Sequence, residues 1–202
     1  QVSVVARELK SYPSLSPAYG TPHIGIDEWN ILPFNRSDTV FGTVDTAAHN
    51  AGSIITMIRG GVSVGVRFGG VDVETPSMGG AARSMDFLLA SGSSSKRPAY
   101  YAFMAVNRMA DTPRRLKVSG ESELLALPGL SEDGKRVGVV VSFYDETSAR
   151  RLTQSGTMEP PAGIAHATVE FKNTPWAATG GVSVARSVVD KGRNMVKVGA
   201  SE

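Results

Sequence analysis

The chain has 202 residues, a hydrophobic content of 41% and a formal net charge of only +2, so it can bury a core but carries no field typical of nucleic-acid binding. It has no cysteine, which excludes disulfides, thiolate metal ligands and cysteine nucleophiles, and its 3 histidines are scattered, so we predict no metal site. No apolar run reaches the roughly 20 residues that span a bilayer, so we expect no membrane partner.

The first predicted strand ends in a cluster of polar side chains. Apolar residues at helical spacing predict the end of a helix over residues 2–11, and a loop rich in proline leads to a strand over 23–29. Strict alternation divides the strand into one face with Ile24, Ile26 and Glu28, and another with Gly25, Asp27 and Trp29. A carboxylate at the end of such a strand is well placed for chemistry, although a charge that merely opens a solvated loop is equally compatible with the pattern.

The next segments predict a parallel crossover unit. Apolar residues on one helical face predict a helix over 43–59, which the pair Gly60-Gly61 ends. Alternating valines then predict a strand over 62–68. Strand, helix and strand in this order imply a crossover unit with parallel strands.

A loop rich in Gly and Ser follows over residues 69–97. We expect Phe68, Asp72 and Glu74 to border a site there. The loop has none of the glycine patterns that bind phosphates, so we predict no nucleotide and no other cofactor. Pro98 then starts a helix that runs to Met109.

After Arg115 the sequence pattern changes to short apolar runs separated by turn residues. The predicted strands lie at 116–118, 124–127, 137–143, 167–171, 182–189 and 195–198. Such a succession is typical of an antiparallel β-sandwich. We therefore predict two domains, over residues 1–112 and 113–202.

Two motifs resemble a known family of enzymes. The stretch Gly25-Ile-Asp-Glu-Trp-Asn30 resembles the nucleophile segment that ends the seventh barrel strand of clan A retaining glycosidases. Residues 96–109 resemble the final barrel helix of glycoside hydrolase family 39, the β-xylosidase and α-L-iduronidase family, and the order of the elements fits as well. The arabinofuranosidases of family 51 carry a similar Asp-Glu-Trp-Asn motif and remain an alternative.

The resemblance implies both a fold and a reaction. The fold would be α/β plus all-β: the last two strand-helix units of a (β/α)8 barrel, followed by an antiparallel β-sandwich accessory domain. The reaction would be hydrolysis of a glycosidic bond by double displacement, with Glu28 as the nucleophile. Trp29, Asn30 and Phe68 would bind the carbohydrate substrate.

The resemblance also implies a missing part. The family's acid/base residue follows an Asn, yet this chain contains no Asn-Glu dipeptide, and a complete barrel needs about 250 residues. We therefore expect a second polypeptide that carries the first six strands, and no activity without it. The chain also departs from the family at the eighth strand, where Val66-Arg67-Phe68 replaces an aromatic stretch. The alternative function is a non-catalytic carbohydrate-binding or structural module.

Overall fold

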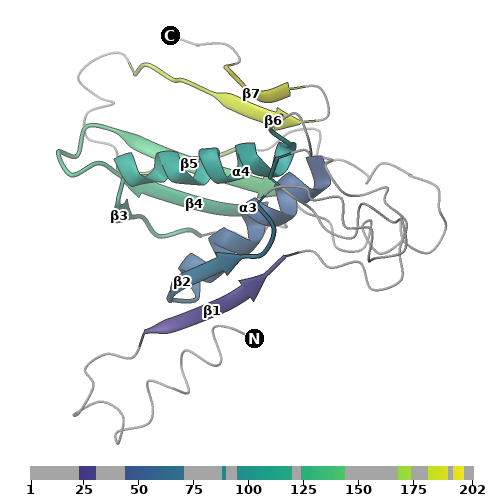
Figure 1. Cartoon of the computed structure of the whole chain (residues 1–202). Helices are drawn as coiled ribbons and strands as arrows, with labels where there is room; N and C mark the ends of the chain where they lie inside the picture. The colour runs from purple at the N-terminus through teal and green to yellow at the C-terminus, as the bar shows by residue number, and fades with distance from the viewer. Residues whose placement is uncertain are drawn as a thin grey trace, which may run out of the picture.

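The computed structural model of the chain describes residues 23–30, 44–70, 88–89, 95–119, 124–143, 168–173, 182–190 and 193–197. The predictions for residues 2–11, Asp72 and Glu74 lie outside these ranges. The elements in chain order (Figure 1) are β1 (Ile24–Trp29), α3 (Val44–Arg59), β2 (Val62–Arg67), α4 (Pro98–Asn107), the 3-10 helix η2 (Arg108–Asp111), β3 (Arg114–Arg115), β4 (Leu124–Leu130), β5 (Val137–Phe143), β6 (Ser187–Asp190) and β7 (Arg193–Lys197).

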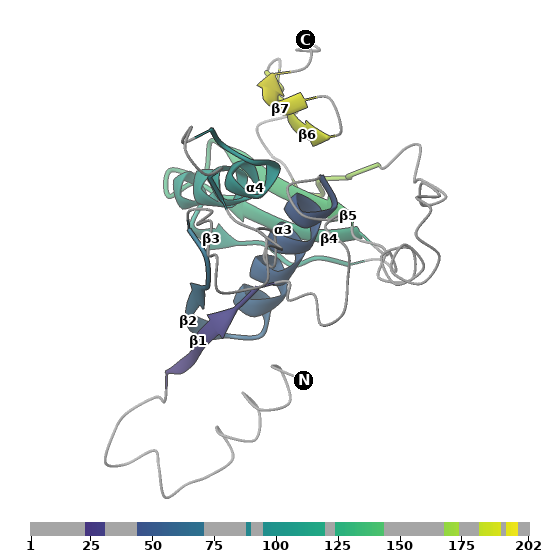
Figure 2. The ribbon, with the colours of Figure 1, turned by 45° about the vertical axis from the view of Figure 1, so that its right-hand side comes forward.

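The predicted crossover unit is confirmed. β1 and β2 are parallel neighbours, and α3 lies between them in the chain. The helix stops at the predicted glycine pair because Gly61 has a φ of 80°, a backbone conformation that side chains disfavour. Figures 1 and 2 show the β1–β2 pair at one end of the described structure and the β6–β7 hairpin at the other, with α3, α4 and the β4–β5 pair between them.

The predicted strands of the second half are confirmed in part. β4 and β5 pair in antiparallel register along their whole length, and β6 pairs with β7 in the same sense. The strand predicted at 116–118 is wrong: β3 lies at Arg114–Arg115 instead. Leu116 donates its N–H to the carbonyl of Pro128, but Pro128 has no N–H to return, so the ladder ends there. Residues 168–173 and 182–186 form no strand, and β6 begins only at Ser187.

The main core joins the helices to the β4–β5 pair. Ile55 of α3, Met109 of η2 and Leu127 of β4 are buried together. Burial of a side chain of this size contributes about 1.5–3 kcal/mol. The hydroxyl of Ser142 in β5 also donates to the carbonyl oxygen of Ala48 in α3, at 2.7 Å. These contacts cross the predicted boundary between residues 112 and 113. The barrel and the sandwich themselves remain predictions.

Two glycines let the end of η2 press against this sheet. Gly129 and Gly138 lie directly opposite each other on β4 and β5, and the buried residue Thr112 covers both. A Cβ atom on Gly129 would collide with the backbone carbonyl oxygen of Thr112, and a Cβ on Gly138 would lie 2.9 Å from the Thr112 hydroxyl oxygen. Arg115 holds the Thr112 carbonyl in place by donating to it at 2.9 Å.

We therefore expect Gly129→Ala to destabilise the chain by about 3 kcal/mol, because the obstacle is backbone that cannot rotate away. Gly70→Ala is the matched control, since a Cβ there meets nothing within 4 Å. Chemical denaturation of both variants measures the difference. Equal stability of the two variants would contradict the close approach.

The turn between β4 and β5 contains a carboxylate with a lowered pKa. Asp133 accepts hydrogen bonds from the Ser131 hydroxyl and from the backbone N–H of Lys135, and these bonds, the Ser131 bond first, lower its pKa below the usual 3.8. In the same turn Gly134 has a φ of 70°, a backbone conformation that glycine adopts readily.

Because the pKa of Asp133 is lower in the folded chain than in the unfolded chain, its charged form stabilises the fold above pH 3.8, and this contribution is lost as the pH falls through the folded value. Asp133→Ala should lower the thermal midpoint at neutral pH, and by less well below pH 3.8. Glu132→Ala in the same turn controls for a lost charge. A deficit for Asp133→Ala that is the same at both pH values would rule out this linkage.

Candidate functional site

An extra residue in β1 changes the faces of its last side chains. Ile26 pairs with Gly65 and Trp29 with Arg67, so β1 advances three residues while β2 advances two, as at a β-bulge. An opposite shift at the start of the pair, where Ile24 pairs with Val62 and Gly25 with Val64, keeps the two strands equal in length overall. The prediction that Glu28 shares the face of Ile24 and Ile26 is therefore wrong. Ile26 and Trp29 face the helices together, whereas Asp27 and Glu28 are exposed.

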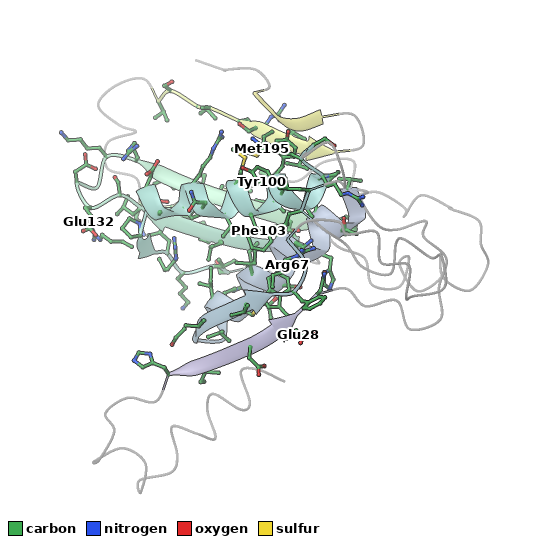
Figure 3. The ribbon with its side chains drawn as sticks, in the orientation of Figure 1. Glu28, Arg67, Tyr100, Phe103, Glu132 and Met195 are labelled. Atoms are coloured by element: carbon green, nitrogen blue, oxygen red, sulfur yellow. The ribbon has the colours of Figure 1, made fainter. Side chains whose placement is uncertain are left out.

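Glu28 lies on the side of β1 that no described helix covers (Figure 3). Alternation on β2 places Val64, Val66 and Phe68 on this same side, because Gly65 and Arg67 face α3. The three side chains are 58%, 52% and 42% exposed. The helix-free face thus presents an apolar strip on β2 and a carboxylate at the carboxyl end of β1, the end at which parallel sheets bind their ligands.

Asn30 and Phe68 are brought together at this end. The Asn30 side chain donates from Nδ2 to the Phe68 carbonyl oxygen at 2.8 Å, and the Phe68 N–H donates to the Trp29 carbonyl oxygen at 3.0 Å. The Asn30 side chain therefore holds the backbone of Phe68, and Phe68 in turn holds the carbonyl of Trp29, which follows Glu28 in the sequence. In the described part of the chain Glu28 itself forms no hydrogen bond or ion pair that holds its carboxylate.

Trp29 lies on the opposite side from Glu28. Its ring stacks on Phe103 of α4, with centroids 6.0 Å apart and planes 16° from parallel. Its indole nitrogen is buried, and no group in the described ranges accepts a hydrogen bond from it. Trp29 and Phe103 also line a mostly apolar cavity of about 300 Å³ between the sheet and the two helices. The side chain thus packs α4 onto β1.

A polar network between α3 and β2 was not predicted. Arg67 donates from Nε to the Asn50 side-chain oxygen at 3.0 Å and from Nη1 to the Gly69 carbonyl oxygen at 2.6 Å. Asn50 is fully buried in α3. The sequence offered two signals: an asparagine among the alanines of a predicted helix and an arginine in a strand of valines. Each of these is common alone.

The described residues include no group of three or more His, Asp or Glu side chains that could hold a metal ion. Within the same ranges, no helix is long and apolar enough to cross a membrane. Comparison of the chain with family models, curated proteins and solved structures found no match. The likeness to glycoside hydrolases therefore rests on the two sequence motifs.

The packing of Trp29 leads to a test. Trp29→Ala should lower the free energy of unfolding by about 3 kcal/mol because it removes the stack on Phe103. Trp29→Phe keeps a ring and removes a buried donor without an acceptor, so it should stay within about 1 kcal/mol of the parent chain. Urea denaturation distinguishes the two, and a Trp29→Ala variant as stable as the parent would show that the ring does not support α4.

Proposed function

We propose that this chain supplies the nucleophile and the closing strand-helix units of a retaining glycoside hydrolase. The observation that supports this best is the position of Glu28, exposed at the carboxyl end of a parallel strand on the face that carries Phe68. Catalytic residues of (β/α)8 barrels come from strand ends of this kind. Sugars bind to such sites through apolar surfaces and hydroxyl hydrogen bonds, which Phe68 and Asn30 would provide.

The chemistry has two steps. An oxygen of the Glu28 carboxylate attacks the anomeric carbon, the bond to the leaving oxygen breaks, and a covalent glycosyl ester forms. Water then attacks the same carbon and releases Glu28 with net retention of configuration. A second carboxyl group, about 5 to 5.5 Å from the first, gives its proton to the leaving oxygen and later takes one from water.

A second polypeptide would provide that acid/base group. Parallel sheets are normally covered on both faces, yet the apolar strip of Val64, Val66 and Phe68 faces away from both helices. A partner whose parallel strands close a barrel with β1 and β2 would cover the strip, because the strip would then face the barrel interior. It would also place its own carboxyl group opposite Glu28. Trp29, which packs against Phe103, would then support the site without touching the sugar.

The nucleophile can be tested without the acid/base group. A dinitrophenyl glycoside has a leaving group that departs without a proton, and fluorine beside the anomeric carbon slows breakdown of the glycosyl ester. We expect a fluorinated dinitrophenyl xyloside to label Glu28, detected as a mass increase on the peptide that contains it. The full chain is tested alone and together with any polypeptide that co-purifies with it.

Glu28→Gln should reduce labelling and nitrophenyl xyloside hydrolysis by about a thousandfold or more, because an amide is not a nucleophile. Asp27→Asn is the matched control: it removes the neighbouring exposed carboxylate and should leave both rates within about threefold. A parallel series with arabinofuranosides tests the other sugar class. Binding of either sugar with no label at Glu28 would support a non-catalytic carbohydrate-binding module instead.

A further inference from the structure

We infer that Arg67 is a positioning residue, which ties α3 to the carboxyl end of β2 and thereby holds Phe68 and Asn30 beside Glu28. This inference rests on the proposed function for its consequence in catalysis. Its structural basis is independent of that function, because it consists of hydrogen bonds to one fixed acceptor and to the backbone. In Figure 3 the Arg67 side chain lies on the helix side of the sheet, opposite Glu28.

The fixed acceptor is the side chain of Asn50. Asn50 is fully buried and donates from Nδ2 to the carbonyl oxygen of Thr46, one helical turn earlier, at 2.7 Å. This bond orients the amide so that its oxygen points toward β2, where Arg67 Nε donates to it at 3.0 Å. A buried amide held at both ends has little freedom, so it fixes the guanidinium relative to α3.

The guanidinium in turn holds the end of β2. Nη1 donates to the Gly69 carbonyl oxygen at 2.6 Å and contacts the Phe68 carbonyl oxygen at 3.4 Å. Gly69 has a φ of 87°, so the strand ends in a sharp change of direction at this point. The Phe68 carbonyl also accepts from Asn30 at 2.8 Å. One carbonyl group thus links Arg67 on β2 with the residue that follows β1.

Few other side chains can make this set of bonds. The planar guanidinium donates in several fixed directions at once, and its carbon lies 6.0 Å from the centre of the Phe103 ring, the ring on which Trp29 stacks. A lysine ammonium carries its three N–H donors on one nitrogen, so it would reach either Asn50 or the Gly69 carbonyl. Since a shift of about 1 Å in a site can lower a rate about a hundredfold, release of this strand end should slow the reaction.

The test compares Arg67→Met with Arg67→Lys and with the exposed control Arg59→Met at the end of α3. The probe is the fluorinated dinitrophenyl xyloside, applied to the full chain together with its co-purified polypeptide. Arg67→Met should lower the maximal labelling rate at Glu28 about tenfold to a hundredfold, with a smaller change in the half-saturating concentration. Arg67→Lys should recover part of the rate, and Arg59→Met should match the parent chain.

Hydrogen exchange provides a second measurement on the same variants. In Arg67→Met the amide of Phe68 should exchange faster, while the amides of β4 and β5 keep their protection. Parent-like labelling and exchange in Arg67→Met would overturn the inference, and so would a uniform loss of protection, which would mean a general role in stability. If the parent chain is not labelled at all, the proposed function fails, and the exchange at Phe68 alone decides whether Arg67 holds the strand end.

Discussion

The described structure depends on the burial of α3 from several sides at once. Ile55 packs against Met109 and Leu127, and the carbonyl of Ala48 accepts a hydrogen bond from Ser142 of β5. Another face of the same helix meets α4 through small side chains, and a third meets β2. A helix held in this way cannot slide along one neighbour without losing contacts with the others, because packed interiors leave few voids. The β1–β2 pair, the second helix and the antiparallel sheet therefore have one common reference element.

The two sides of the β1–β2 pair have different roles. The side toward the helices carries Trp29, Gly65 and Arg67, whose contacts join the sheet to α3 and α4. The other side carries Glu28 and Phe68, which are exposed. Rigid packing on one side and accessible groups on the other is the division that a site on a scaffold requires, because positions on strands and helices are held more closely than positions on loops.

The sequence predicted the elements better than the faces of their side chains. Apolar spacing located α3, α4 and most paired strands, because that spacing arises from burial within each segment. The face on which Glu28 lies was predicted wrongly because the bulge in β1 is defined by its pairing with β2. That strand is separated from β1 in the chain by the whole of α3. The end of β3 at Pro128 likewise depends on a partner strand. Asn50 and Arg67 acquire a role only as a pair, and no local pattern connects them.

The additional residue in β1 also affects how this segment is compared with others. If the same residues from Ile26 to Trp29 were pleated regularly, without the bulge, the final side chains would exchange their inward and outward orientations. The indole would then be directed outward and the carboxylate toward the helices. A gapless sequence match around Asp-Glu-Trp-Asn is therefore not enough to equate the sites of two proteins. The pleating of the strand determines which of these side chains reaches the exposed face.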